Sequence, residues 1–307
     1  MRIVLFGQAA FGEKVLERLI ERRENVVGVY TPPDPPGVKN AMKELAQKAG
    51  IRVFQPRSMK APAVLEEYKK LTTDLNVLAF VTDIIPGGIL NHPKHGSIQY
   101  HPSLLPKHRG KSAINWAVIQ GEKRTGLSIF WVDAGIDTGP ILLQKEVEIG
   151  PEDTTGSLYF NKLFPMGVDA LMEGLDMVKS GRAPRITQDK SQATYEPPCE
   201  EPHGRIHWDR PLAELYNLIR GCDPQPGAYC LHEQKKVKIF AAKTLPGRGT
   251  AAEPAPGEIL DVTEKAILVA GLGGALLVEK VRPEGEGKMG AAEFAKRAGL
   301  RAGMRFL

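Results

Sequence analysis

Two side chains near residue 100 have the types and the spacing needed to stabilise an oxyanion. Gln99 and His101 are separated by one residue in Ser97–His101, a run that is typical of a short strand. In an extended strand, side chains two positions apart point to the same side. An amide and an imidazole placed together at a strand end can both donate hydrogen bonds to an oxygen that gains negative charge. A surface turn with an ordinary histidine is the alternative interpretation.

The residues downstream add a candidate carboxylate to this pair. A loop punctuated by prolines, Pro102–Gly110, leads into an apolar helix expected over Ser112–Gln120. Further along, the glycine-containing stretch Asp133–Gly139 carries two carboxylates, Asp133 and Asp137. From the residues alone, Asp137 is more typical of a turn, and Asp133 competes with it for a catalytic role.

Together these residues resemble the family of enzymes that use 10-formyltetrahydrofolate. The resemblance rests on S-L-L-P-x-x-R-G over residues 103–110 and on D-T-G over residues 137–139. It implies that 10-formyltetrahydrofolate is the formyl donor, that His101 donates to the formyl oxygen, and that Asp137 pairs with this histidine. It further implies that the folate is bound by Asp83, Ile84, Ile85 and Asp137 around the pterin ring and by Ser103, Leu104, Leu105 and Pro106 at the reaction centre.

Position 99 departs from the transferases of this family, which carry Asn two residues before the histidine. Gln99 can donate the same kind of hydrogen bond, but its side chain is one methylene longer. The hydrolase domain of 10-formyltetrahydrofolate dehydrogenase also departs from Asn there, and residues 100–116, 130–139 and 158–165 look most similar to that domain. We therefore expect water as the favoured formyl acceptor. The alternatives are an amine, on methionyl-tRNA or on a small molecule, and a catalytically inactive module that binds folate or RNA.

Other members of the family fit less well. Methionyl-tRNA formyltransferase carries a basic insertion after the second strand, whereas Thr31–Asn40 is short and contains a single lysine. Glycinamide ribonucleotide formyltransferase lacks a second domain, and its glycine-rich phosphate loop is missing from Gly7–Gly12. Residues 235–307 contain 13 Lys or Arg against 8 Asp or Glu, an excess that would suit RNA but is more typical of a solvated surface.

The first half of the chain alternates strand-like and helix-like segments. This alternation predicts an α/β fold, a Rossmann-like, mostly parallel sheet with helices on both faces. Ligands collect at the carboxyl ends of the strands in such sheets, where Gly7, Asp83 and His101 would emerge. The expected strands are Ile3–Phe6, Val26–Tyr30, Val53–Gln55, Leu75–Val81, Ile98–His101, Leu127–Val132 and Ile141–Ile149, and the expected helices are Glu13–Glu21, Lys39–Ala49 and Thr154–Ser180.

The second half of the chain no longer alternates strand-like and helix-like segments. Gly181–Gly204 is rich in proline and polar residues and is expected to be a linker. A helix over Pro211–Arg220 and short strands bounded by Gly and Pro then predict a small, OB-like β-barrel. These strands are Gly227–Cys230, Val237–Leu245, Gly257–Val262, Ala266–Ala270 and Ala275–Val281. The expected domains are therefore a catalytic domain over 1–180, a linker over 181–204 and a barrel over 205–307.

The composition of the 307 residues narrows the class of protein. Hydrophobic residues make up 42% and charged residues 25%, and no apolar run approaches the roughly 20 residues of a membrane span. Cys199, Cys222 and Cys230 lack C-x-x-C spacing, which indicates reduced thiols and a cytoplasmic location. No metal is expected, because the histidines between 92 and 108 lack ligand spacing and neighbouring cysteines.

Overall fold

Two compact units make up the chain in the computed structural model, which describes residues 1–247 and 254–307. The first unit contains residues 1–111, 125–147 and 160–196. The second contains residues 112–124, 148–159 and 197–307. Three segments build each unit, so the chain passes between them several times.

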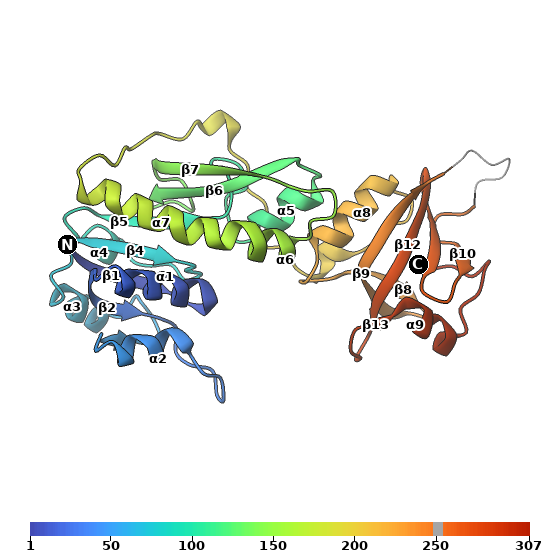
Figure 1. Cartoon of the computed structure of the whole chain (residues 1–307), viewed down its shortest axis with the longest axis horizontal. Coiled ribbons are helices and arrows are strands. Elements are labelled where there is room, and N and C mark those ends of the chain that lie inside the picture. Colours follow the sequence, from blue (N-terminus) through green and yellow to red (C-terminus); the bar gives the residue numbers. More distant parts are fainter. Residues whose placement is uncertain (248–253) are drawn as a thin grey trace. The chain divides into compact units, whose positions relative to one another are not determined.

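The first unit is built on a seven-stranded sheet with the order β3-β2-β1-β4-β5-β6-β7 (Figure 1). The pairs from β3 to β5 are parallel, and β6 is antiparallel to β5. The predicted mostly parallel sheet is thus confirmed. Its strands are β1 (Arg2–Gly7), β2 (Asn25–Tyr30), β3 (Val53–Phe54), β4 (Leu75–Ala79), β5 (Ser97–His101), β6 (Arg124–Trp131) and β7 (Ile141–Glu148).

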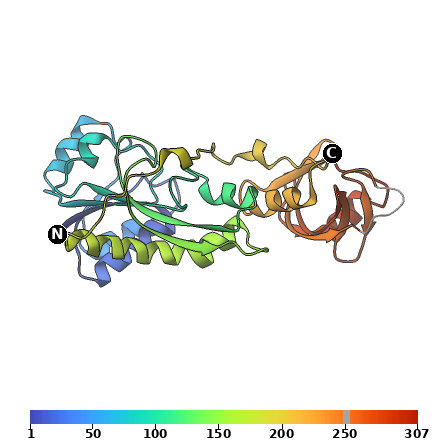
Figure 2. The same cartoon turned by 90° about the horizontal axis from the view of Figure 1, so that it is seen from above.

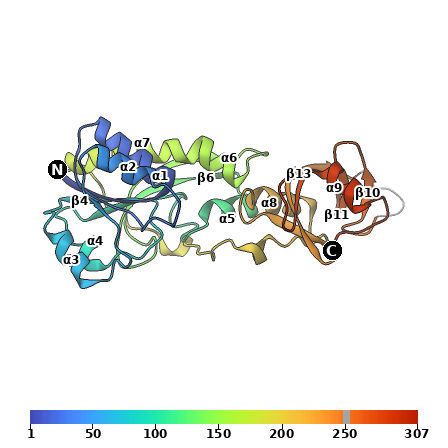
Figure 3. The same ribbon diagram turned by 90° about the horizontal axis from the view of Figure 1, so that it is seen from below.

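Helices cover both faces of this sheet, as predicted. Figure 3 shows α1 (Ala9–Glu21), α2 (Ala41–Lys48) and α7 (Phe164–Lys179) on one side, with α3 (Pro62–Lys69) and α4 (Gly87–Leu90) on the other. On β5, Ile98 and Tyr100 belong to the buried core under the first group of helices. Because side chains alternate along a strand, Gln99 and His101 face the side of α3 and α4.

The helix expected over Thr154–Ser180 is interrupted in the structure. It consists of α6 (Thr155–Leu158), a π-helical turn over Tyr159–Leu163 and α7. Pro165, in the first turn of α7, has no backbone N–H, so the regular i→i−4 ladder cannot run through this point. The spacing of apolar residues in the sequence does not reveal such a π-helical turn.

The second unit holds an antiparallel sheet with the order β10-β11-β12-β9-β8, and β13 pairs with β12. The end of the chain pairs with both outer strands: Ile259 donates to the Met304 carbonyl, and Leu231 and Leu307 exchange two backbone hydrogen bonds. These contacts close the sheet into the predicted barrel (Figure 2). The elements of this unit are α5 (Ala113–Ile119), α8 (Leu212–Gly221), β8 (Ala228–His232), β9 (Lys235–Pro246), β10 (Ile259–Val262), β11 (Ile267–Gly271), β12 (Gly274–Pro283), β13 (Met289–Gly290) and α9 (Ala291–Ala298).

The segment expected to be a linker is irregular, with short 3-10 turns over Lys190–Gln192 and Glu201–Gly204. It nevertheless makes long-range bonds. Ile186 and Ile141 exchange two backbone hydrogen bonds, and Arg109 donates to the Thr194 carbonyl. Among the residues that the structure describes, no helix is both long and apolar enough to cross a membrane.

Candidate active site

His101 ends β5 and is only 4% exposed, yet both of its ring nitrogens face polar atoms. Nε2 lies 2.8 Å from the carbonyl oxygen of His108, and Nδ1 lies 3.5 Å from Oδ2 of Asp137. A carbonyl oxygen can only accept a hydrogen bond, so Nε2 carries a hydrogen in this arrangement. Nδ1 is the nitrogen that is left to face the carboxylate.

Asp137 reaches this imidazole from the loop between β6 and β7. It is 8% exposed, and its Oδ2 accepts a hydrogen bond of 2.8 Å from the Gly110 N–H. Its backbone is left-handed, with φ of 53°, which is uncommon outside glycine and asparagine. The structure therefore brings together the imidazole and the carboxylate that the sequence analysis selected, although 36 positions separate them in the chain.

Asp133, the competing carboxylate, has a different position. Its Oδ1 accepts hydrogen bonds from the Gly135 N–H at 3.0 Å and from the Thr138 hydroxyl at 2.6 Å. Both partners lie in its own loop, and Asp133 is exposed. This carboxylate therefore shapes the loop that carries Asp137.

Gln99 lies two residues before His101 on β5, where it is paired with Leu78 of β4 and Phe130 of β6. It is half-buried on the same face as His101. Within residues 1–247 and 254–307, no hydrogen bond to its side-chain amide is present.

The loop over Ser103–Pro106 is fixed to the sheet by Ser128. The Ser128 hydroxyl donates to the Ser103 carbonyl at 2.7 Å and accepts from the Leu105 N–H at 3.0 Å. Ser103 and Leu105 are buried, whereas Leu104 and Pro106 are half-buried. Of the four loop residues that the resemblance assigned to the reaction centre, only Leu104 and Pro106 thus retain appreciable exposure.

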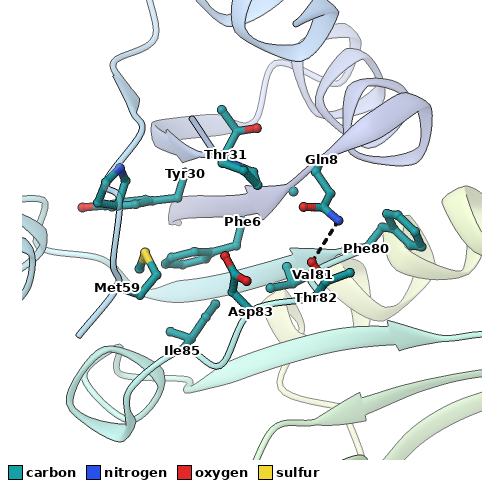
Figure 4. A pocket seen from close by; sticks show the side chains of 13 residues that line it. Phe6, Gln8, Tyr30, Thr31, Met59, Phe80, Val81, Thr82, Asp83 and Ile85 are labelled. Atoms are coloured by element: carbon teal, nitrogen blue, oxygen red, sulfur yellow. Dashed lines mark hydrogen bonds between the residues drawn. The ribbon is translucent and has the colours of Figure 1, made fainter. Parts of the chain in front are cut away.

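A pocket that is partly open to solvent lies at the carboxyl ends of β1, β2 and β4 (Figure 4). Asp83 and Ile85 line it, whereas Ile84 is 73% exposed outside its lining. Its aromatic wall includes Phe6 and Tyr30, whose rings stack at 4.9 Å, and Figure 4 shows the Asp83 carboxylate next to Phe6. Burial raises the pKa of the Tyr30 phenol, and Asp83 is the one residue of the lining with a carboxyl group.

Several polar residues around the carboxylate were missed by sequence reasoning. Gln188 bonds the backbone of the Asp137 loop, and Glu196 lies 3.2 Å from Nδ1 of His108. The Thr194 hydroxyl accepts from the His108 N–H at 2.8 Å. None of the three was given a role from the sequence, because they come from the irregular segment 181–204, which lacks the periodicity of a helix or strand. Among the described residues, no group of three or more His, Cys, Asp or Glu could hold a metal ion.

The glycine of the D-T-G motif allows a close backbone approach. A Cβ at position 139 would lie 1.7 Å from the Trp131 carbonyl oxygen, so we expect Gly139→Ala to lower the free energy of unfolding by about 3 kcal/mol or more. Urea unfolding would measure this loss. Gly287→Ala is the matched control, because nothing lies within 4 Å of the added Cβ. An unchanged urea midpoint for Gly139→Ala would contradict this close approach.

Comparison with known proteins shows the family of this chain. Residues 1–173 match the family described as formyl transferase, and residues 200–299 match its C-terminal domain. The chain belongs to the formyltransferase family. It is 41% identical over 273 residues to cytosolic 10-formyltetrahydrofolate dehydrogenase from Xenopus laevis, a match that covers 87% of this chain and 30% of that protein. It therefore spans about a third of the length of that relative.

A second relative matches along its whole length. Methionyl-tRNA formyltransferase from Alkaliphilus oremlandii is 36% identical over 300 residues, which is 96% of both chains. Among solved structures, HypX from Aquifex aeolicus in complex with tetrahydrofolic acid has a TM-score of 0.69 at 19% identity, covering 97% of this chain and 47% of that chain. An N-formyltransferase from Helicobacter canadensis has the same TM-score at 17% identity, covering 91% and 99%. The two structures establish the likeness of fold.

Proposed function

We propose that this protein removes the formyl group from 10-formyltetrahydrofolate, with water as the favoured acceptor, to give tetrahydrofolate and formate. The observation that carries the proposal is the buried contact between the His101 imidazole and the Asp137 carboxylate at the carboxyl end of β5. The match to the dehydrogenase from Xenopus laevis over 87% of this chain supports the choice of folate donor.

Asp137, His101 and Gln99 each have a separate role in the proposed reaction. Asp137 takes a proton from water, whose oxygen forms a bond to the formyl carbon and creates a tetrahedral intermediate. Its oxyanion is stabilised by hydrogen bonds from the free amide of Gln99 and from the His101 imidazole, whose Nδ1 must then carry a hydrogen because the Nε2 hydrogen is bonded to the His108 carbonyl. The intermediate collapses by breaking the bond from carbon to N10, which receives the proton, and formate leaves. The oxygen of water is thus found in formate and one of its hydrogens on N10, and the other hydrogen is released as a proton when formic acid ionises.

Folate binding is assigned to the loops on either side of this centre. The pocket in Figure 4 offers a flat aromatic wall and one carboxylate, Asp83, which can accept from the N–H groups of a pterin ring. Ile84 and Ile136, which is 56% exposed, are apolar side chains on the two loops and are available to cover the rest of the folate.

The other assignments from the sequence are kept as part of this proposal. By function, we assign catalysis to residues 1–180 and an accessory role to the barrel over 205–307. Residues 181–204 join them in sequence, although residues 181–196 pack with the first unit and residues 112–124 and 148–159 with the second. We place the protein in the cytoplasm, where thiols stay reduced, since Cys199, Cys222 and Cys230 are all free.

Transfer to an amine is the second candidate function. It is favoured by the match to methionyl-tRNA formyltransferase over 96% of both chains. Against it stands Gln99, whose longer side chain shifts the amide from the position that Asn occupies in the transferases.

Product analysis in the absence of an acceptor separates these functions. We expect the protein, incubated with 10-formyltetrahydrofolate alone, to release tetrahydrofolate and formate in equal amounts, faster than an enzyme-free blank. Absorbance reports tetrahydrofolate, and formate dehydrogenase reports formate. Release that requires methionyl-tRNA or a small amine would establish the transferase instead. Binding of folate without any release would show an inactive binding module.

A further inference from the structure

A buried amide ties together the two segments that hold the Asp137 carboxylate. Gln188 is 5% exposed and lies between α7 and the 3-10 turn over Lys190–Gln192. Its Nε2 donates to the carbonyl oxygens of Asp137 at 2.9 Å and of Gly139 at 2.7 Å. Its Oε1 accepts from Nη2 of Arg109 at 2.7 Å. All the donors of this amide, and one of its acceptor sites, are therefore used.

The Asp137 loop needs such an anchor. Residues 133–136 are exposed, and the left-handed backbone of Asp137 is a conformation that persists only where its surroundings enforce it. The two bonds from Gln188 fix the carbonyls on both sides of Thr138. With these carbonyls fixed, the direction of the Cα–Cβ bond of Asp137 is fixed as well.

The third bond connects this loop to the turn that binds the carboxylate. Arg109 immediately precedes Gly110, whose N–H donates to Oδ2 of Asp137. One amide thus links the loop that carries the carboxylate to the side chain of Arg109, which comes from the turn that receives the carboxylate. A displacement of about 1 Å in a reacting group can lower a rate by about 10²-fold.

We propose that Gln188 is a positioning residue, which acts through Asp137 by holding its carboxylate against the His101 imidazole. This inference rests on the proposed function for the role of Asp137. Gln188 itself lies behind the loop, bonded to backbone carbonyls and to Arg109, and has no part in proton transfer.

Gln188→Glu is the variant that tests this role. Glutamate keeps the shape and can still accept from Arg109, but it turns an oxygen toward two carbonyl oxygens in place of the donor. We expect kcat for release of tetrahydrofolate to fall about 10- to 100-fold, while KM for 10-formyltetrahydrofolate changes by less than about threefold. Gln192→Glu is the matched control, because this exposed glutamine lies on the same segment. Equal losses of kcat in Gln188→Glu and Gln192→Glu would overturn the proposal.

A double-mutant cycle shows whether Gln188 acts through Asp137. In an Asp137→Asn background, Gln188→Glu should cause little further loss of kcat, because the group that it positions is already disabled. If the fold-losses of kcat from the two single substitutions multiply in the double variant, the proposal that Gln188 acts through Asp137 is overturned. The proposed deformylation activity would not be affected by that result. If Gln188→Glu does not fold, Arg109→Lys replaces it in the same cycle, since lysine cannot reproduce the planar guanidinium bond to Oε1.

Hydrogen exchange tests the same contact without relying on turnover. Amides of residues 134–139 should exchange faster in Gln188→Glu than in the parent protein or in Gln192→Glu. Unchanged exchange would overturn the positioning role. If the parent protein releases no tetrahydrofolate, the proposed function fails, and this measurement still decides whether Gln188 holds the loop.

Discussion

Replacing His101 by asparagine is expected to lower the rate of deformylation by about 10²- to 10⁴-fold. The asparagine amide can donate from a position near that of Nδ1, but it cannot reach the His108 carbonyl that Nε2 contacts at 2.8 Å. The variant therefore loses the hydrogen bond to the loop after β5, so its amide is not held in the position from which His101 donates to the oxyanion.

The experiment separates loss of chemistry from loss of structure. Initial rates of tetrahydrofolate release at saturating donor measure kcat, and calorimetric titration with tetrahydrofolate measures binding, which we expect to change little. Removal of one buried hydrogen bond lowers the free energy of unfolding by about 1 kcal/mol, so the variant should fold. His92→Asn is the control, because His92 is an exposed histidine that packs against the Tyr68 ring. Near-normal turnover in His101→Asn would remove His101 from the mechanism.

The face that His101 occupies could be predicted because strand alternation is a local property. Ile98 and Tyr100 pack into the core under α1 and α7, and this leaves Gln99 and His101 on the opposite face. The strands of the sheet are similarly visible in the sequence, since buried parallel strands are short apolar runs. α3, α4 and α9 were not foreseen, because each is only four to eight residues long and shows too few turns for helical periodicity.

The choice between Asp133 and Asp137 as the catalytic carboxylate could not be made from the local sequence alone. From the residues alone, either carboxylate could have been the turn residue, and the resemblance selected Asp137. In the structure, the bonds of Asp133 to Gly135 and Thr138 span only two and five positions. The bond between Asp137 and Gly110 spans 27 positions, so it depends on how the loop folds back over β5.

Gln188 could not be predicted from the sequence, for the same reason. Its partners are Arg109, Asp137 and Gly139, at separations of 79, 51 and 49 positions. A polar residue in a proline-rich segment is ordinarily solvated, and only tertiary contacts bury it. The segment that composition indicates as a linker thus supplies a buried amide to the site.

The second large effect is expected from Asp137→Asn, which should lower kcat by about 10²- to 10⁴-fold with KM for the donor nearly unchanged. Asparagine has the shape of aspartate and tolerates a left-handed backbone, so the loop should keep its conformation. Its side-chain oxygen can still accept from the Gly110 N–H. The amide lacks only the ability to take a proton from the attacking water and the negative charge beside His101.

Asp133→Asn provides the matched comparison within the same loop. Its remaining oxygen can keep the bonds to the Gly135 N–H and the Thr138 hydroxyl, so we expect a change in kcat of less than about threefold. Both variants should show the melting temperature of the parent protein to within a few degrees, because neither removes a buried apolar group. A loss in Asp133→Asn as large as that in Asp137→Asn would mean that loop geometry, and no single carboxylate, limits the rate. Full activity in Asp137→Asn would mean that another group activates the water, since a neutral amide cannot do so.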